Sequence, residues 1–229
     1  METIKGLKRT NYCGELRIED AGKEVTLFGW CQRQRDLGNL IFIDLRDRTG
    51  LVQLSFNDTT DREVFAKAQS VRAEYVVAAV GTVCERESKT NKIATGDIEI
   101  NVKEFRIISK AETPPFEIAK SEKVGDETTL KYRYLNLRNE KLTQNILMRH
   151  KIAKIAREYF YDNDFIEIET PMMIKSTPEG ARDYVVPSRV HNGKFYALPQ
   201  SPQIYKQLCM IAGFDTIMKL MLLPSVAFL

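Results

Sequence analysis

Histidine and cysteine are scarce in this sequence, and their positions exclude several kinds of catalytic site. The two histidines, His150 and His191, have no nucleophile partner nearby, so we interpret both as structural or surface residues. No Walker loop, zinc motif or serine-hydrolase elbow is present, and we expect no metal ion held by this chain. The four cysteines are too widely spaced for a CxxC pair or a metal knuckle, which is typical of a reducing cytoplasm: Cys13, Cys31, Cys84 and Cys209.

Long hydrophobic runs are also missing. The first residues lack the apolar core of a signal peptide, and the longest apolar stretch, 217–229, contains Lys219 and Pro224 and is too short to span a bilayer. We therefore expect a cytoplasmic protein with no membrane contact. Because the formal net charge is only +3, any nucleic acid has to be bound by a local basic cluster rather than by the field of the whole chain.

Residues 22–109 predict a small β-barrel. Stretches with strand character are punctuated by turns, and one stretch with helical spacing follows the third of them. This order is that of a five-stranded OB-fold barrel with Greek-key connections. The predicted strands are 25–31, 40–46, 51–56, 75–86 and 97–108, the helix is 60–72, and a tight turn occupies 47–50.

Alternation along the second and third strands separates a core face from an outer face. The core set is Ile41, Ile43, Leu45, Val52, Leu54 and Phe56. Phe42 is then a large aromatic residue on a polar face, and Gln53 and Ser55 also point outward. Arg33 and Arg35 follow the first strand.

Such a face suits single-stranded nucleic acid. A base stacks on an aromatic ring, which contributes roughly 1–3 kcal/mol per base, while an amide reads a base edge and arginine pairs with a phosphate. A structural alternative stays open at this point, in which Phe42 covers one end of the barrel and the arginines are solvated.

The second half, 139–229, follows a polar, proline-containing segment at 110–138 that we interpret as a hinge. Helical periodicity runs through 142–160, with an apolar stripe at Ile146, Ile152, Ile155, Ala156 and Tyr159. Residues 165–171 and 195–198 predict strands. A last helix is expected to have Ser201 as its N-cap and Pro202 at its first position, and to end at Gly213.

On this last helix we expect the core stripe to be Ile204, Leu208 and Ile211. Gln203 and Lys206 lie on another face, where a lysine can bind a substrate carboxylate as a point charge. Glu179 lies in a glycine-containing loop that can fold over a ligand. Taken alone, Lys206 and Glu179 are better explained as surface charges.

Several motifs together resemble the bacterial-type aspartyl-tRNA synthetases, which are class II aminoacyl-tRNA synthetases. The most specific is Thr-Pro-Glu-Gly-Ala-Arg-Asp at 177–183. The others occupy 28–30, 33–38, 40–47, 130–138, 169–171 and 200–203, so the resemblance spans roughly 10–215. It implies an α+β protein with an OB-fold anticodon-binding domain (1–109), a hinge (110–138) and the first part of a class II antiparallel-sheet catalytic domain (139–229).

The resemblance implies roles for individual residues in tRNA binding. The barrel would bind the anticodon loop of tRNA(Asp), with Phe42 stacked on an anticodon base. Gln53 and Arg35 would read the central anticodon base, and Glu99 the first. Residues 160–171 resemble class II motif 1, which forms the homodimer interface and ends in Pro171. Asp164 stands where that motif usually has glycine.

The reaction implied is that of an aspartate–tRNA ligase. Aspartate attacks the α-phosphate of ATP, Mg²⁺ neutralises the phosphates, and the aspartyl group then passes to the tRNA. Glu179, Gln203 and Lys206 would bind the aspartate. The asparagine and lysine enzymes of the same subclass are disfavoured by the 177–183 motif and Lys206, whereas strict aspartate specificity and dual Asp/Asn-tRNA specificity both stay open.

Residues 216–229 depart from the family pattern, and motifs 2 and 3, with the ATP-clamping arginines and Mg²⁺ ligands, are missing from this sequence. We therefore interpret the chain as an N-terminal fragment that is inactive in adenylation by itself and keeps at most anticodon binding. Two alternatives stay open: a non-catalytic OB module that binds tRNA or other single-stranded nucleic acid, and a folding-defective product.

Overall fold

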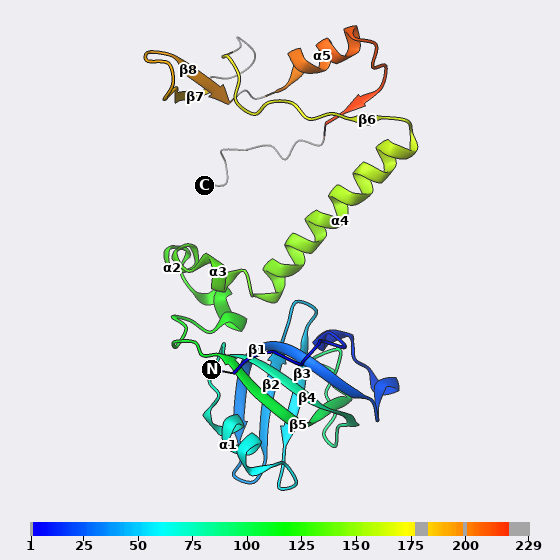
Figure 1. Cartoon of the computed structure of the whole chain (residues 1–229), viewed down its shortest axis with the longest axis vertical. Helices are drawn as coiled ribbons and strands as arrows, with labels where there is room; N and C mark the ends of the chain where they lie inside the picture. The colour runs from blue at the N-terminus through cyan, green and yellow to red at the C-terminus, as the bar shows by residue number, and fades with distance from the viewer. Residues whose placement is uncertain (1, 177–182, 199–200, 220–229) are drawn as a thin grey trace. The chain divides into compact units, whose positions relative to one another are not determined.

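The computed structural model describes residues 2–176, 183–198 and 201–219 (Figure 1). Contacts between Cα atoms divide the chain into two compact units, Met1–Gln144 and Asn145–Leu229. The first unit holds the β-barrel and the segment that follows it. No described helix is both long and apolar enough to cross a membrane.

The first unit is built around a closed five-stranded barrel, which confirms the predicted OB fold (Figure 1). Its strands are β1 (Glu24–Asp36), β2 (Ile41–Arg46), β3 (Leu51–Phe56), β4 (Val76–Glu85) and β5 (Ile98–Ser109), and α1 (Arg62–Ser70) connects β3 to β4. The order around the barrel is β1-β2-β3-β5-β4. The β3–β5 pair is parallel and closes the barrel, while the other neighbours are antiparallel.

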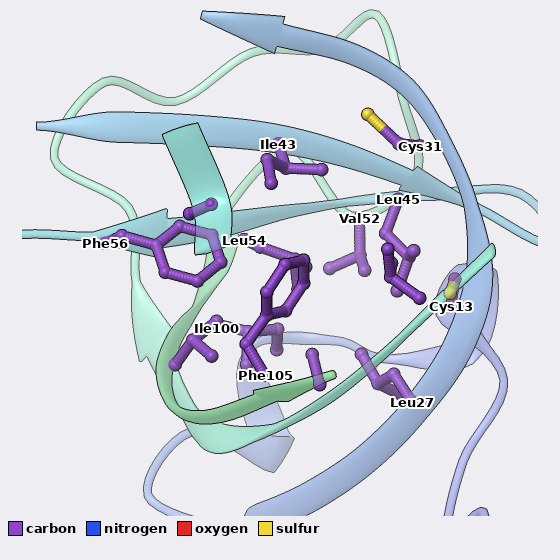
Figure 2. Packing of buried hydrophobic residues seen from close by; sticks show 14 of the residues in the cluster. Cys13, Leu27, Cys31, Ile43, Leu45, Val52, Leu54, Phe56, Ile100 and Phe105 are labelled. Atoms are coloured by element: carbon purple, nitrogen blue, oxygen red, sulfur yellow. The ribbon is translucent and has the colours of Figure 1, made fainter. Parts of the chain in front are cut away.

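The barrel interior contains the core residues that strand alternation predicted. Figure 2 shows Ile43, Leu45 and Leu54 among the side chains that gather there, and the six residues of the predicted core set are completely buried. Phe56 and Phe105 meet edge to face, with ring centroids 5.1 Å apart. The turn at 47–50 is also confirmed, because the Asp47 amide donates to the Gly50 carbonyl.

Two predicted outward residues differ from expectation. Gln53 and Ser55 lie on the face of β3 opposite the core set, yet each is only 3% exposed. The Ser55 hydroxyl donates to the Ile100 carbonyl of the neighbouring strand, and Gln53 is enclosed by charged side chains. Their burial comes from strand β5 and the residues after β4, which alternation within β3 does not reveal.

The polar segment after the barrel is partly helical. It contains a 3-10 stretch (Ile118–Lys123), α2 (Asp126–Lys131) and α3 (Arg133–Asn136), around a small apolar cluster of Phe116, Ile118 and Leu135. The next residues contact the barrel through a buried carboxylate, that of Glu74. Arg138 donates to it at 2.7 Å, and Arg46 of β2 donates to both of its oxygens at 2.9 and 2.7 Å.

The cluster of Glu74, Arg46 and Arg138 joins the segment after α3 to the barrel. The Glu74 and Arg46 side chains are 5% and 10% exposed, and the Arg138 guanidinium lies 4.7 Å from the centroid of the Trp30 indole ring. Glu74 itself has φ +64°, a left-handed conformation that is uncommon for residues other than glycine. A charged residue is therefore held at a costly backbone position by the two arginines.

The second unit contains α4 (Glu140–Asp162), which begins within the first, β6 (Ile166–Glu167), β7 (Tyr184–Pro187), β8 (Phe195–Leu198), α5 (Gln203–Ile211) and β9 (Ile217–Met218). β7 and β8 form an antiparallel hairpin, and β6 pairs with β9 in parallel. The strand expected at 165–171 is thus only two residues long.

The apolar stripe of α4 and the expected core stripe of α5 are not buried by the described residues. Along α4, Ile146, Ile152, Ile155 and Tyr159 are each more than half exposed, and along α5 so are Leu208 and Ile211. Neither helix has a buried residue, because no described layer of the chain covers them. The expected N-cap of α5 is also wrong: Pro202 occupies that position, one residue later than predicted. Its C-terminal Gly213, with φ +95°, is confirmed.

Burial predicts different reactivity for the four thiols. Cys13 and Cys31 are completely buried, and desolvation raises the pKa of the Cys31 thiol to about 12 and that of Cys13 still further. Since the thiolate is the nucleophile, we expect an iodoacetamide reagent at pH 8 to modify the partly exposed Cys84 and Cys209 while sparing the other two. Mass spectrometry of the labelled protein reads this out. Labelling of Cys31 in the folded protein as fast as Cys84 would contradict the assignment, and labelling in urea is the control.

Candidate nucleic-acid interface

Gln53 is the centre of a polar network on the outer face of the barrel. The Gln53 carbonyl oxygen accepts a hydrogen bond from Arg35 at 2.9 Å and another, short one from Arg86. Its amide nitrogen donates to the Glu99 carboxylate at 2.7 Å. The amide is therefore fixed in one orientation by three charged neighbours.

Strand register explains why these residues meet. Arg35 of β1 is paired with Phe42 of β2, Asp44 of β2 with Gln53 of β3, and Gln53 in turn with Glu99 of β5. Successive pairs across neighbouring strands place side chains of the same face side by side. The result is a row that crosses four strands of the barrel. All four anticodon-face residues predicted from the sequence, Arg35, Phe42, Gln53 and Glu99, lie in it.

Arg35 connects the aromatic part of the row to the polar part. Its guanidinium carbon lies 5.3 Å from the centroid of the half-buried Phe42 ring, and one of its nitrogens donates to Asp44 at 2.9 Å. Its Nε is buried and has no hydrogen-bond partner among the described residues. A buried donor without a partner is costly and suits an incoming acceptor.

The network is balanced in charge. Two guanidinium groups, of Arg35 and Arg86, face two carboxylates, of Asp44 and Glu99. Such a site offers directional donors and acceptors but little net attraction for a polyanion. It is thus suited to reading the edge of a base rather than to holding phosphates.

Sequence reasoning missed the parts that Asp44 and Arg86 play in this network. Alternation along β2 places Asp44 on the outer face beside Phe42 but predicts no partner for it. Arg86 directly follows β4, and its approach to Gln53 spans 33 residues of sequence. Only the closed order of the strands brings it there. Arg33, by contrast, is exposed and makes no ion pair with the described residues.

The residues expected to bind aspartate are only partly described. Gln203 is the first residue of α5, and the Lys206 amide donates to the Pro202 carbonyl in its first turn. The Lys206 ammonium group forms no ion pair within the described ranges, and Gln203 is exposed. Glu179 lies outside the described residues, and so does most of the loop around it.

The segment resembling motif 1 shows one informative conformation. Asp164 has φ +61°, in the left-handed region that glycine adopts without strain and that aspartate tolerates better than most residues. This explains why glycine is the usual residue there and why aspartate is accepted. Pro171 is exposed.

A metal centre does not form in the part of the chain that the structure describes. Within 2–176, 183–198 and 201–219, no three histidine, cysteine or acidic side chains come together to hold an ion.

Two family models match the chain. The model of the OB-fold nucleic acid binding domain matches residues 25–108, and that of the class II tRNA synthetases (D, K and N) matches residues 125–221. The second match extends into the stretch from 216 that was expected to depart from the family pattern.

Curated relatives are similar over nearly the whole chain. The chain is 57% identical to the aspartate–tRNA ligase of Ruminiclostridium cellulolyticum over 93% of its length. It is 58% identical to the aspartate–tRNA(Asp/Asn) ligase of Caldanaerobacter subterraneus over the same share. In both cases it spans 36% of the relative's length.

Solved structures agree with the fold. The asparaginyl-tRNA synthetase of Pyrococcus horikoshii, complexed with asparaginyl-adenylate, superposes with a TM-score of 0.80 at 27% identity, over 94% of this chain and 48% of that one. The aspartyl-tRNA synthetase of Entamoeba histolytica gives a TM-score of 0.75 at 26% identity, over 94% of this chain and 45% of that one. With its OB-fold barrel, its class II segment and these relatives, the chain is similar over most of its length to the aspartyl-tRNA synthetases, which are class II aminoacyl-tRNA synthetases.

Proposed function

We propose that the barrel binds the anticodon loop of tRNA(Asp). The observation that carries this proposal is the row of Phe42, Arg35, Gln53 and Glu99, which sets an aromatic ring beside a fixed amide on one face of an OB fold. The anticodon-reading roles of these residues in the family supply the identity of the RNA.

The hydrogen-bonding capacity left in the row suits the edge of a base. Gln53 has used one of its two amide N–H groups on Glu99, so one donor is left. The Nε of Arg35 is a second donor, and the Glu99 oxygen that Gln53 does not use is an acceptor. Gln53 lies between Arg35 and Glu99, so both donors lie on one side of the acceptor. We assign the donors of Gln53 and Arg35 to the central anticodon base and the acceptor of Glu99 to the first.

A base can stack on Phe42 in two ways. Since the Arg35 guanidinium already lies over the ring, a base takes either the other face of Phe42 or the place of Arg35. A displaced Arg35 has its Nε free to meet an acceptor of that base or a phosphate.

We further propose that the second unit supplies part of the aspartate site of an aspartate–tRNA ligase. Lys206 would bind the side-chain carboxylate, Gln203 would contact the bound aspartate, and Glu179 would bind the α-ammonium group. ATP and Mg²⁺, the family's co-substrate and its metal ion, need groups outside the described residues. A cytoplasmic homodimer is the assembly expected from the family, with the motif 1 segment and Pro171 at its interface.

The proposal is tested on the purified chain with a hairpin RNA that carries the anticodon loop of tRNA(Asp). We expect binding that weakens by roughly 1–3 kcal/mol when the central anticodon base is changed, because each read base contributes about this much. Aspartate-dependent ATP–pyrophosphate exchange on the same sample is expected to be absent. Exchange activity would contradict the missing ATP site.

The control is a hairpin of the same stem with a scrambled loop. Equal affinity for both loops would remove the anticodon assignment and leave the second candidate, a sequence-independent nucleic-acid-binding OB module. That candidate requires that the network contacts every base with the same affinity.

A further inference from the structure

A second arginine–aromatic cluster lies on the same barrel, away from the Gln53 network. The guanidinium carbons of Arg9 and Arg48 each lie 4.6 Å from the centroid of the Tyr12 ring. Arg9 is also 5.7 Å from the Phe28 ring centroid and donates to the Phe28 carbonyl at 3.0 Å. We call Arg9, Tyr12 and Arg48 the arginine–tyrosine stack.

Hydrogen bonds between the N-terminal segment and the β2–β3 turn hold the stack together. The Cys13 amide donates to the Asp47 carboxylate at 2.7 Å, and the Gly14 amide donates to the Thr49 hydroxyl at 2.9 Å. A Cβ on Gly14 would lie 2.2 Å from the Thr49 carbonyl oxygen, so only glycine allows this approach. Tyr12 is therefore fixed beside Arg48 although 36 residues separate them along the chain.

The two positive charges of the stack are not neutralised. Both guanidinium groups lie near the same ring, so they are no more than about 9 Å apart and repel each other. Neither arginine belongs to an ion pair with any residue that the structure describes. The carboxylate of Asp47, which precedes Arg48 in the sequence, already accepts hydrogen bonds from Cys13 and from the amide and hydroxyl of Thr49.

Stacking against an aromatic ring prepares arginine for phosphate. A guanidinium held flat on a ring keeps its N–H edge free and loses less side-chain freedom when it binds a phosphate in a bidentate manner. Both arginines are exposed, and Arg48 makes no hydrogen bond to any described residue. The stack thus offers two positive charges that have no ion-pair partner among the described residues, whereas the charges of the Gln53 network cancel.

Position along β2 connects the two features. Phe42 is the second residue of β2 and Arg48 follows its end by two residues, a span of about 20 Å at the rise of a strand. A stacked nucleic-acid strand advances about 3.4 Å per nucleotide, so this span corresponds to roughly six nucleotides. An OB fold commonly covers about 4–16 nucleotides, so one RNA can reach both.

We propose that the arginine–tyrosine stack is a phosphate-binding subsite for the RNA strand whose bases are read at the Gln53 network. This rests on the proposed function for its ligand, an RNA hairpin. The two sites then have different roles. Gln53 and its neighbours discriminate between bases. Arg9 and Arg48 bind phosphates and so release counter-ions, which supplies a large share of the affinity for nucleic acid.

The test compares salt dependence and loop preference in the full chain. For the double variant Arg9→Gln/Arg48→Gln we expect affinity for the anticodon hairpin to fall about tenfold or more at low salt. The slope of log K against log salt should become shallower by about 1.5, since each lost phosphate contact contributes about 0.7–0.9. The ratio of affinities for cognate and scrambled loops stays unchanged.

Three further variants separate the effect of lost charge from the effect of altered structure. Lys103→Gln removes an exposed, ion-paired positive charge from the same barrel and is expected to leave the slope nearly as in the wild type. Arg48→Gln alone leaves the Arg9–Phe28 hydrogen bond intact and should lower the slope by about half as much. Tyr12→Leu keeps both charges and should weaken binding with a smaller change of slope. Thermal unfolding of each variant verifies that it is folded.

The outcomes distinguish this proposal from the anticodon assignment. An unchanged slope in the folded double variant, with loop discrimination intact in the wild type, overturns the phosphate subsite alone. A lowered slope without loop discrimination supports the subsite and overturns the base-reading role. Failure of the wild-type chain to bind the hairpin at any salt concentration overturns both.

Discussion

Replacing Glu74 with glutamine is expected to lower the free energy of unfolding by about 3–5 kcal/mol, because it leaves buried positive charge without its partner. Glutamine keeps the size of the side chain and the backbone position, so packing changes little. What disappears is the carboxylate that accepts from one Arg46 nitrogen on both of its oxygens and from Arg138 on one of them. Urea denaturation followed by circular dichroism measures the loss.

The matched control for Glu74→Gln is Glu24→Gln. Glu24 pairs with Lys103, and both side chains are about 60% exposed, so solvent already screens the pair and little stability should be lost. A Glu74→Gln variant as stable as this control would show that Arg46 and Arg138 are solvated rather than dependent on Glu74. Arg138→Gln should cost less, because its side chain is more exposed than that of Arg46.

Removing the Phe42 ring or the Gln53 amide is expected to have the largest effects on RNA binding. Phe42→Ala should weaken binding of the anticodon hairpin by about 1–3 kcal/mol, with cognate and changed loops affected alike, because stacking is indifferent to the base. Gln53→Ala should instead reduce discrimination at the central base towards none. Fluorescence anisotropy with both hairpins measures the two effects together.

Which quantity changes, the affinity or the discrimination between loops, matters more than the size of the change. Gln53 is buried and bonded to Arg35, Arg86 and Glu99, so its removal also loosens the row, and unfolding curves must accompany the binding data. Arg33→Gln is the control, since it removes an exposed arginine of β1 outside the row. Unchanged affinity and unchanged discrimination in both Phe42→Ala and Gln53→Ala would exclude this face as the RNA site.

The barrel was largely predictable from the sequence. Alternating apolar residues specify which side of β2 and β3 faces inward, and a turn residue such as Gly50 ends each run, so both signals are local. The five strands and α1 follow the predicted order, with bounds that differ by a few residues. β1 is longer than predicted because it continues beyond Cys31 and pairs with β2 from Trp30 to Asp36.

Long-range polar contacts were not predictable. Arg46, Glu74 and Arg138 are separated by 28 and 64 residues, and nothing periodic marks them as partners. The same holds for Arg86 beside Gln53. The apolar stripes of α4 and α5 failed for the opposite reason: the pattern correctly marks a face that favours burial, but cannot say which part of a protein covers it.

The parallel pairing of β3 with β5 has a consequence for synthesis of the protein. Gln53 and Glu99 are bonded neighbours 46 residues apart, and β5 also pairs with β4 along its whole length. A nascent chain that has emerged from the ribosome only as far as β4 thus has its first four strands but cannot close the barrel. Contacts of such high sequence separation form late, because the loop entropy must be overcome first. During translation the row that we propose to bind RNA is therefore completed only when β5 arrives.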